Sequence, residues 1–512
     1  MKEWFYSAAR PGEGKSRWAD DMMARVPGRY VLALDRCNVF SGRLNRLAES
    51  AVRHGTTPTI ISIYSRRDTD RGTGSVRRDI AMAGKDYEHL DHVILLITHE
   101  GLKSSDMSGF DGGWTCIIDE VMSIWDEDAI CTPLSHVQME KGYALEPVDG
   151  TEWSRVRVKS DGHTLVDLYK DDHLKSLTLF HSRAQDRGVF VKLKQWVDAA
   201  NGDPWVWWSI WNPCELNAFD QIYQLGNALD KTVTFHLLQY WFGDQIEMKP
   251  FQISAAPEVW QPRRLTIQYF ARAHRARTSF WGQVGEEKDH ADGQECLRRV
   301  AEWIRENSDP DNHYWCSNIG RLNQHGKIGD LVRDPAQGIP GWRISPKIAG
   351  SNDFKHITVT SAIYTSKPSN VTKGILSQFG ITADQIIRSR EYEDLLQIFL
   401  RCSGRVASDT RDLTLRLYDV EQAEFIRDWI REVGLPFECE LVQIDLGLDI
   451  FQNVKPGPKP KELSDEEKLK KVTKAQQSSA ERSRNYRAKK RAEEQAAGAV
   501  PKKRGRKPKV LA

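Results

Sequence analysis

The feature that most constrains the fold of this 512-residue chain is the run at residues 9–16, Ala-Arg-Pro-Gly-Glu-Gly-Lys-Ser. The run lies between a short apolar stretch at residues 4–8, which has the composition of a strand, and a helix-like stretch at residues 18–26. A glycine-rich turn between a strand and a helix can point its backbone N–H groups inward, where they bind phosphate oxygens together with the helix N-terminus. The sequence therefore begins as an α/β domain with a phosphate-binding loop at its first turn.

Each residue type in this loop has a chemical reason to be there. Gly12 and Gly14 let the backbone curl without a side-chain clash, Lys15 is placed to reach the β- and γ-phosphates, and the Ser16 hydroxyl is a ligand for Mg²⁺. We therefore predict an ATP site with Mg²⁺, formed by Ala9, Gly12, Glu13, Gly14, Lys15 and Ser16.

A second chemical motif follows the apolar strand-like run at residues 114–118. This run ends in Asp119 and Glu120, and strand ends face the ligand in open parallel sheets. Hydrolysis of a nucleotide needs a carboxylate for Mg²⁺ and a group that orients water. We predict that Asp119 and Ser16 hold the metal and that Glu120 activates the attacking water.

The order of predicted elements gives the domain organisation. Strand-like runs alternate with helix-length segments through the first 120 residues, and the alternation resumes at Leu265, which predicts parallel sheets with helices on both faces. Between about residues 140 and 260 the rhythm is less clear and tryptophan is dense, and we interpret most of these indoles as core. The expected domains are residues 1–260, residues 261–450 and a tail at residues 451–512.

Charge separates the tail from the rest of the chain. Residues 455–512 carry nineteen Lys/Arg and seven Asp/Glu, a net of +12, so residues 1–454 carry −10 of the formal total of +2. Lysine and arginine displace the counterions that are condensed on phosphates, so a basic tail favours a nucleic-acid partner. The segment that begins Lys-Pro-Gly-Pro-Lys-Pro at Lys455 is typical of a disordered linker.

Other features exclude classes of protein. The longest purely aliphatic run, residues 93–97, is far shorter than the roughly 20 residues that cross a bilayer, so we expect no membrane partner. The N-terminus lacks the apolar core of a signal peptide. The eight cysteines include no Cys-x-x-Cys pair, which argues against a zinc site or a disulfide framework. We expect an intracellular protein, cytoplasmic or nucleoid-associated, or nuclear in a eukaryote.

The loop at residues 9–16 and the Asp119-Glu120 strand end resemble the first half of a superfamily 2 helicase of the DEAD/DEAH-like group. The first motif of that family often begins with alanine, as at Ala9, and its second is an apolar strand that ends in Asp-Glu. Residues 93–100 resemble the segment that lies near the nucleic-acid backbone. Residues 222–229 resemble, more weakly, the third motif, which couples the ATP site to the strand-binding face.

The second half of the chain extends the resemblance. The run from Gln397 to Arg405 is similar to the sixth helicase motif, in which arginines reach across the interdomain cleft to the γ-phosphate. We expect a helix over residues 392–405, on which Gln397, Arg401 and Arg405 would line one face. The resemblance implies that Arg401 and Arg405 are catalytic, with Arg401 the firmer candidate, and that the fold has two tandem RecA-like P-loop NTPase domains. Residues 349–354 look like a loop of the fourth or fifth motif.

The end of the tail resembles an AT-hook, whose Arg-Gly-Arg core lies in the narrow minor groove of A/T-rich DNA. Arg504, Gly505 and Arg506 match that core and are the predicted DNA-binding residues. The same octet, residues 501–508, also fits a nuclear import signal.

These observations together predict an ATP-dependent helicase or translocase, with DNA favoured over RNA as its track. Two alternatives remain open. One is a viral terminase-type packaging ATPase with a nuclease, for which Asp445 and Asp449 are the available carboxylates. The other is a DNA-binding replication protein in which ATP only switches the conformation.

Overall fold

The computed structural model describes residues 1–451 with several gaps. The gaps are residues 65–75, 131–135, 171–173, 202, 254–258, 276–286, 319–337 and 347–352. The predicted tail, with Arg504, Gly505 and Arg506, lies outside the described residues, as does most of the loop at residues 349–354.

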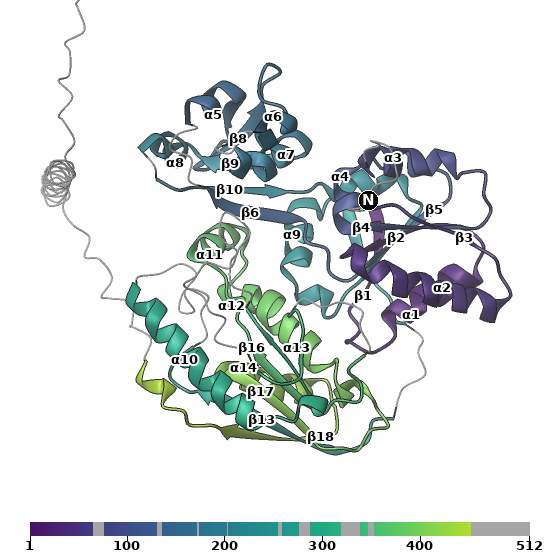
Figure 1. The fold of residues 1–512 in the computed structure, drawn as a ribbon. Coiled ribbons are helices and arrows are strands. Elements are labelled where there is room, and N and C mark those ends of the chain that lie inside the picture. The colour runs from purple at the N-terminus through teal and green to yellow at the C-terminus, as the bar shows by residue number, and fades with distance from the viewer. Residues whose placement is uncertain are drawn as a thin grey trace, which may run out of the picture. The chain divides into compact units, whose positions relative to one another are not determined.

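The first sheet has seven parallel strands in the order β12-β1-β11-β5-β2-β4-β3 (Figure 1). Strands β2, β4 and β5 are mostly apolar and buried because helices cover both faces of the sheet. Buried side chains of α1 and α2 pack on one face, and those of α3, α4 and α9 pack on the other. The bounds are β1 Lys2–Ser7, α1 Lys15–Arg25, β2 Arg29–Leu34, α2 Phe40–His54, β3 Thr59–Ser62, α3 Val76–Asp86, β4 Val93–Thr98, α4 His99–Ser104, β5 Trp114–Asp119, β11 Gln221–Leu225, α9 Val233–Phe242 and β12 Ile246–Pro250.

An inserted antiparallel sheet separates β5 from β11, in the order β6-β10-β9-β8-β7. The tryptophans of its strand β10 are buried, which confirms that they are core residues. The alternation of Trp205 and Trp207 predicts a strand here, which β10 confirms, but the other four strands of this sheet were not recognised because the pattern of the surrounding sequence is less clear. The bounds are β6 Trp125–Ile130, α5 His136–Gly142, β7 Tyr143–Pro147, β8 Trp153–Val158, α6 Leu165–Lys170, α7 Thr178–Asp186, β9 Gly188–Lys192, α8 Leu193–Asp198 and β10 Trp205–Ile210.

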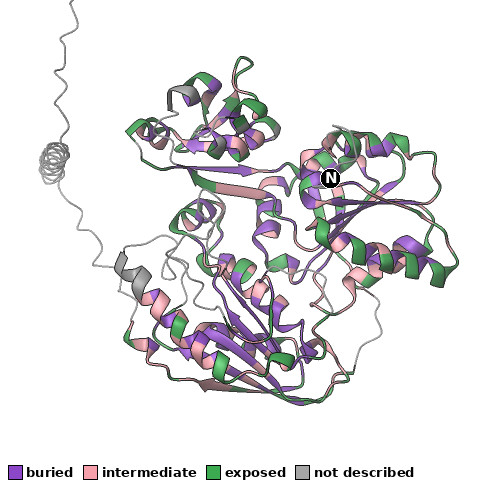
Figure 2. Ribbon diagram, viewed as in Figure 1, coloured by how far each residue is buried: buried purple, intermediate pink, exposed green. Residues whose placement is uncertain are grey.

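The third sheet is again fully parallel, in the order β15-β14-β16-β17-β13-β18. Helices α13 and α14 pack on one face and α10 on the other. The predicted fold class is therefore confirmed, with two parallel α/β sheets in tandem. The strands at the centre of this third sheet are buried between the helices (Figure 2). The bounds are β13 Arg263–Ala271, α10 Glu287–Glu306, β14 His313–Ser317, β15 Trp342–Arg343, β16 Val359–Ile363, α11 Asn370–Leu376, α12 Ala383–Ile387, α13 Glu393–Phe399, β17 Leu413–Asp419, α14 Val420–Glu432 and β18 Phe437–Gln443.

One predicted helix was wrong at both ends. We expected a helix over residues 392–405, but a single turn of π-helix at Arg388–Tyr392 joins α12 to α13, and α13 ends at Phe399. The backbone N–H of Ser403 then donates to the carbonyl of Ile357 (2.8 Å) instead of continuing the helix. Gln397, Arg401 and Arg405 therefore do not share one helical face.

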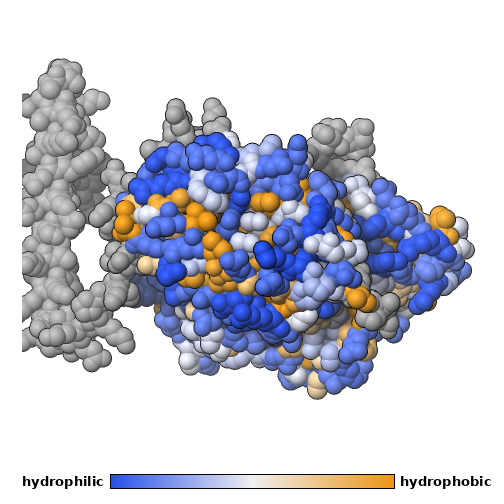
Figure 3. All heavy atoms as spheres, turned by 90° about the horizontal axis from the view of Figure 1, so that it is seen from below, coloured by the Kyte–Doolittle hydropathy of each residue, from blue (hydrophilic) through white to orange (hydrophobic). Residues whose placement is uncertain are grey.

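The face of the molecule in Figure 3 is mostly hydrophilic, with smaller apolar areas between the charged side chains. Among the described helices, none has the length and apolar composition needed to cross a membrane.

Candidate active site

The turn between β1 and α1 has the backbone shape that its glycines predict. Gly12 and Gly14 have φ values of +91° and +83°, which side-chain-bearing residues rarely adopt. Apart from the adjoining residues of the chain, no atom lies within 4 Å of a Cβ built at either position, so glycine is needed here for its backbone conformation and not because space is short. Gly14 is the N-cap of α1, which leaves the helix N-terminus open to an anion.

Lys15 folds back over this turn. Its ammonium group donates to the carbonyl oxygen of Arg10 (2.9 Å) and also to that of Ala9. Burial lowers the pKa of Lys15, and the nearby carboxylates of Glu120, Glu393 and Asp119 oppose that shift. The Glu13 carboxylate does not pair with Lys15 but accepts hydrogen bonds from the main-chain N–H of Arg10 (2.7 Å) and from the Arg10 guanidinium.

Ser16 and Asp119 meet although 103 positions separate them. The Ser16 hydroxyl donates to Asp119 Oδ2 (2.9 Å), with Oδ1 at 3.2 Å. A hydroxyl and a carboxylate are hard oxygen ligands of the kind that Mg²⁺ prefers. The two residues predicted to hold the metal are therefore adjacent, and their chemistry fits it.

Arg43 on α2 is a charged neighbour that the sequence reasoning missed. Its side chain is 3% exposed, with Nη1 2.5 Å from Asp119 Oδ2, Nε 2.5 Å from Asp20 Oδ1 and Nη2 3.2 Å from the Ser16 carbonyl. It thus links α1 to the end of β5. No local signal marks it, because its partners come from other elements.

Glu120 has φ of +72°, an unusual value for a residue with a side chain. Burial raises the pKa of its carboxyl to about 7, the Asp119 charge adds to the shift, and Lys15 and Arg401 oppose it. Strained backbone and a carboxyl of raised pKa are often found at functional sites. A base with a pKa near neutrality suits the predicted role of Glu120 in activating water.

One cavity of about 580 Å³ collects most of the predicted residues. Gly12, Gly14, Lys15 and Ser16 line it from the first parallel sheet, and Glu120 lies at the end of β5. Gln397, Arg401 and Arg405 line it from the segment that follows the third sheet's β16. Ala9, Glu13 and Asp119 are not among the lining residues. Burial lowers the pKa of Arg401, and the charge of Glu120 counteracts that shift.

Hydrogen bonds also link the two parallel-sheet regions to each other. Asn227, in the segment that resembles the third motif, donates to Glu393 Oε2 (2.5 Å) on α13. Gln397 Nε2 donates to the other oxygen of Glu393 (2.9 Å), and Arg401 Nη2 lies 3.5 Å from Gln397 Oε1. The main chain beside Asn227 also bonds to the end of β1, through Gly226 N to Ser7 O (3.1 Å). These contacts connect the phosphate loop to Arg401.

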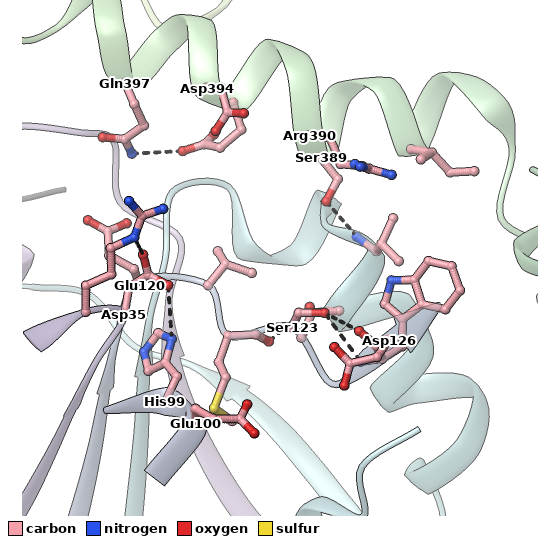
Figure 4. Close-up of a pocket in the computed structure, with 18 of the residues that line it drawn as sticks. Asp35, His99, Glu100, Glu120, Ser123, Asp126, Ser389, Arg390, Asp394 and Gln397 are labelled. Atoms are coloured by element: carbon pink, nitrogen blue, oxygen red, sulfur yellow. Dashed lines mark hydrogen bonds and ion pairs between the residues drawn. The ribbon is translucent and has the colours of Figure 1, made fainter. Parts of the chain in front are cut away.

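A second cavity, of about 630 Å³, shares Glu120 with the first (Figure 4). Its lining includes Glu120 and Gln397, and also His99 and Glu100 from the segment that resembles a nucleic-acid-binding motif. Burial lowers the pKa of His99 to about 4, so its imidazole is neutral at pH 7. Because a carbonyl oxygen can only accept a hydrogen bond, the proton of this neutral imidazole is on Nε2, which donates to the Asp119 carbonyl oxygen (2.9 Å).

The two carboxylates of the nuclease alternative have structural partners. Asp449 Oδ1 accepts from the main-chain N–H groups of Arg272 (2.6 Å) and Ala273 (2.7 Å), and Asp445 Oδ1 accepts from Gly447 N (2.9 Å). Both side chains therefore cap turns. Within the described parts of the chain, no cluster of three or more His, Cys, Asp or Glu is arranged to hold a metal ion.

No family model and no curated protein matches the sequence. Several solved structures are similar to this chain at low identity. An XPD helicase is 12% identical over 86% of this chain and 96% of its own, with a TM-score of 0.47. Xpd4 of S. tokodaii is 11% identical over 85% and 96%, with a TM-score of 0.42. A DEAD box protein of Methanococcus jannaschii is 10% identical over 86% and 88%, with a TM-score of 0.27.

Proposed function

We propose that this protein is a nucleic-acid-dependent ATPase, a helicase or translocase that hydrolyses ATP between residues 1–260 and 261–450. The observation that carries the proposal is the 580 Å³ cavity, in which a phosphate loop, Glu120 and two arginines from a distant segment line one space. A phosphate loop alone implies only nucleotide binding. Arginines delivered from a second α/β region make hydrolysis depend on how the two regions approach each other.

Each residue has a distinct role in this proposal. The loop N–H groups and Lys15 bind the β- and γ-phosphates, and Ser16 and Asp119 hold Mg²⁺, which supplies charge neutralisation at the phosphates. Glu120 accepts a proton from the attacking water. Arg401 and Arg405 stabilise the charge that develops on the transferred phosphoryl group.

The nucleic-acid partner is proposed on separate grounds. The +12 net charge of residues 455–512 favours polyanion binding, and Arg504, Gly505 and Arg506 favour DNA through a minor-groove contact. A tail of this kind raises the local concentration of the ATPase on its track.

The test is steady-state ATP hydrolysis without nucleic acid and with single-stranded DNA, duplex DNA or RNA. We expect strong stimulation by DNA, and Lys15→Ala should abolish turnover because the phosphates lose their cation. Arg25→Ala, which changes an exposed arginine at the other end of α1 and outside the cavity, is the matched control. Nucleic-acid-stimulated turnover that survives in Lys15→Ala would refute the assignment, and slow turnover that no polymer stimulates would favour an ATP-operated switch.

A further inference from the structure

Arg263, the first residue of β13, has no role in the proposed chemistry but is fully enclosed, with a side chain that is 0% exposed. Its guanidinium lies over the ring of Phe437, 4.9 Å from the centroid. Burial lowers the pKa of Arg263, and its nearest carboxylate, Asp409, is 3.8 Å away. A buried arginine is costly unless its donors are used, so its hydrogen-bond partners identify what it does.

Those partners lie on the short segment that carries the two arginines of the active site. Arg263 Nη2 donates to the Ser403 carbonyl oxygen (2.6 Å), and Nη1 lies 3.4 Å from Ser403 Oγ. Ser403 is two residues after Arg401 and two residues before Arg405. One side chain therefore fixes the midpoint between them.

This segment has little regular structure of its own. Helix α13 ends at Phe399, and only a three-residue 3₁₀ turn, Ser403–Arg405, follows. The main chain is held at Ser403 by a bond from its N–H to the Ile357 carbonyl (2.8 Å), and the Ser403 carbonyl is held by Arg263. Bonds between close neighbours, such as Arg401 N to the Ile398 carbonyl (3.1 Å) and Arg405 N to the Cys402 carbonyl (3.2 Å), turn the chain within this segment. The two bonds at Ser403 tie the segment to other elements of the fold.

We propose that Arg263 is a positioning residue, which holds the segment at residues 400–405 so that Arg401 and Arg405 meet the phosphates. The inference rests on the proposed ATPase function. Displacement of a catalytic group by about 1 Å can cost two orders of magnitude in rate. A charged donor to Ser403 thus acts on the rate of hydrolysis and leaves the phosphate loop, which binds the nucleotide, unchanged.

The experiment compares Arg263→Gln with Arg264→Gln in the full-length protein. Arg264 is the adjacent residue and is exposed, so it controls for the loss of one positive charge. We expect Arg263→Gln to lower kcat ten- to a hundredfold, with the KM for ATP and the affinity for a fluorescent ADP analogue within twofold of wild type. Arg264→Gln should change none of these.

A double variant separates positioning from general support of the fold. If Arg263 acts through Arg401 and Arg405, Arg263→Gln should lower kcat less in an Arg401→Ala background than in the wild type, because only Arg405 is then left to position. Both proteins can lose thermal stability. Multiplicative losses, unchanged kcat or a loss confined to nucleotide affinity would each overturn the inference. Wild-type protein without ATPase activity would instead overturn the proposed function.

Arg263→Lys keeps the test decisive if Arg263→Gln does not fold. Lysine retains the charge beside Asp409, but it cannot present two planar donors to Ser403. We expect it to fold and to show a smaller loss of kcat in the same direction. Full activity in Arg263→Lys would contradict the need for the guanidinium geometry.

Discussion

Replacement of Glu120 by glutamine should stabilise the nucleotide-free protein at alkaline pH while it abolishes hydrolysis. The carboxyl has a pKa of about 7 in the folded protein against an ordinary value of 4.5. A pKa raised by folding means that the native state binds the proton more tightly, so the contribution of Glu120 to stability is greatest below pH 4.5 and is lost as the pH rises through 7. Glutamine resembles the protonated acid and escapes this loss.

The size of the effect follows from the two pKa values. A difference of about 2.5 between folded and unfolded states corresponds to a free energy on the order of 3 kcal/mol. The variant should therefore be more stable than wild type by about 3 kcal/mol at pH 8 and by about 1 kcal/mol or less at pH 5.

The assay is thermal unfolding followed by circular dichroism from pH 5 to pH 8.5, with EDTA present so that no metal binds Asp119. The difference in midpoint between Glu120→Gln and wild type should grow with pH. Glu424→Gln, on the exposed face of α14, is the control and should show no such trend. A difference that is independent of pH, or a variant less stable than wild type at pH 8, would refute the reasoning about burial.

Three further predictions test other parts of the site. Arg401→Ala should still bind ATP but lose at least about a thousandfold in kcat, as single-turnover hydrolysis and nucleotide titration would reveal, and normal turnover would make the arginine structural. Asn227→Ala should lower DNA-stimulated kcat about tenfold, because Glu393 loses a 2.5 Å hydrogen bond. The control Lys231→Ala should have little effect, because both side chains of the Lys231–Glu432 ion pair are more than half exposed. Equal effects in the two variants would contradict this prediction. Removal of residues 455–512 should weaken DNA binding and flatten its dependence on salt concentration, measured by fluorescence anisotropy, and an unchanged slope would mean that the tail does not contact phosphates.

Local patterns allowed much of the fold to be predicted. Strands at β1, β2, β4 and β5 were recognised because buried parallel strands are continuous apolar runs, and such runs need no knowledge of distant residues. In the inserted sheet the same reasoning recognised only β10. It also extended α13 to residue 405, because Leu400–Arg405 has a helix-compatible composition and the bond from Ser403 to Ile357 depends on residues 46 positions apart.

The sequence by itself determined the parts of the site that lie close together along the chain. The phosphate loop needs only consecutive residues with two glycines at positive φ, and the acidic pair needs only a strand that ends at Asp119. The tertiary structure alone decided the rest: that Arg43 neutralises Asp119, that Asn227 bonds Glu393, and that Arg263 anchors Ser403. These contacts join residues 76 to 166 positions apart, and polar side chains that are satisfied only by distant partners leave no periodic pattern in the sequence from which they could be recognised.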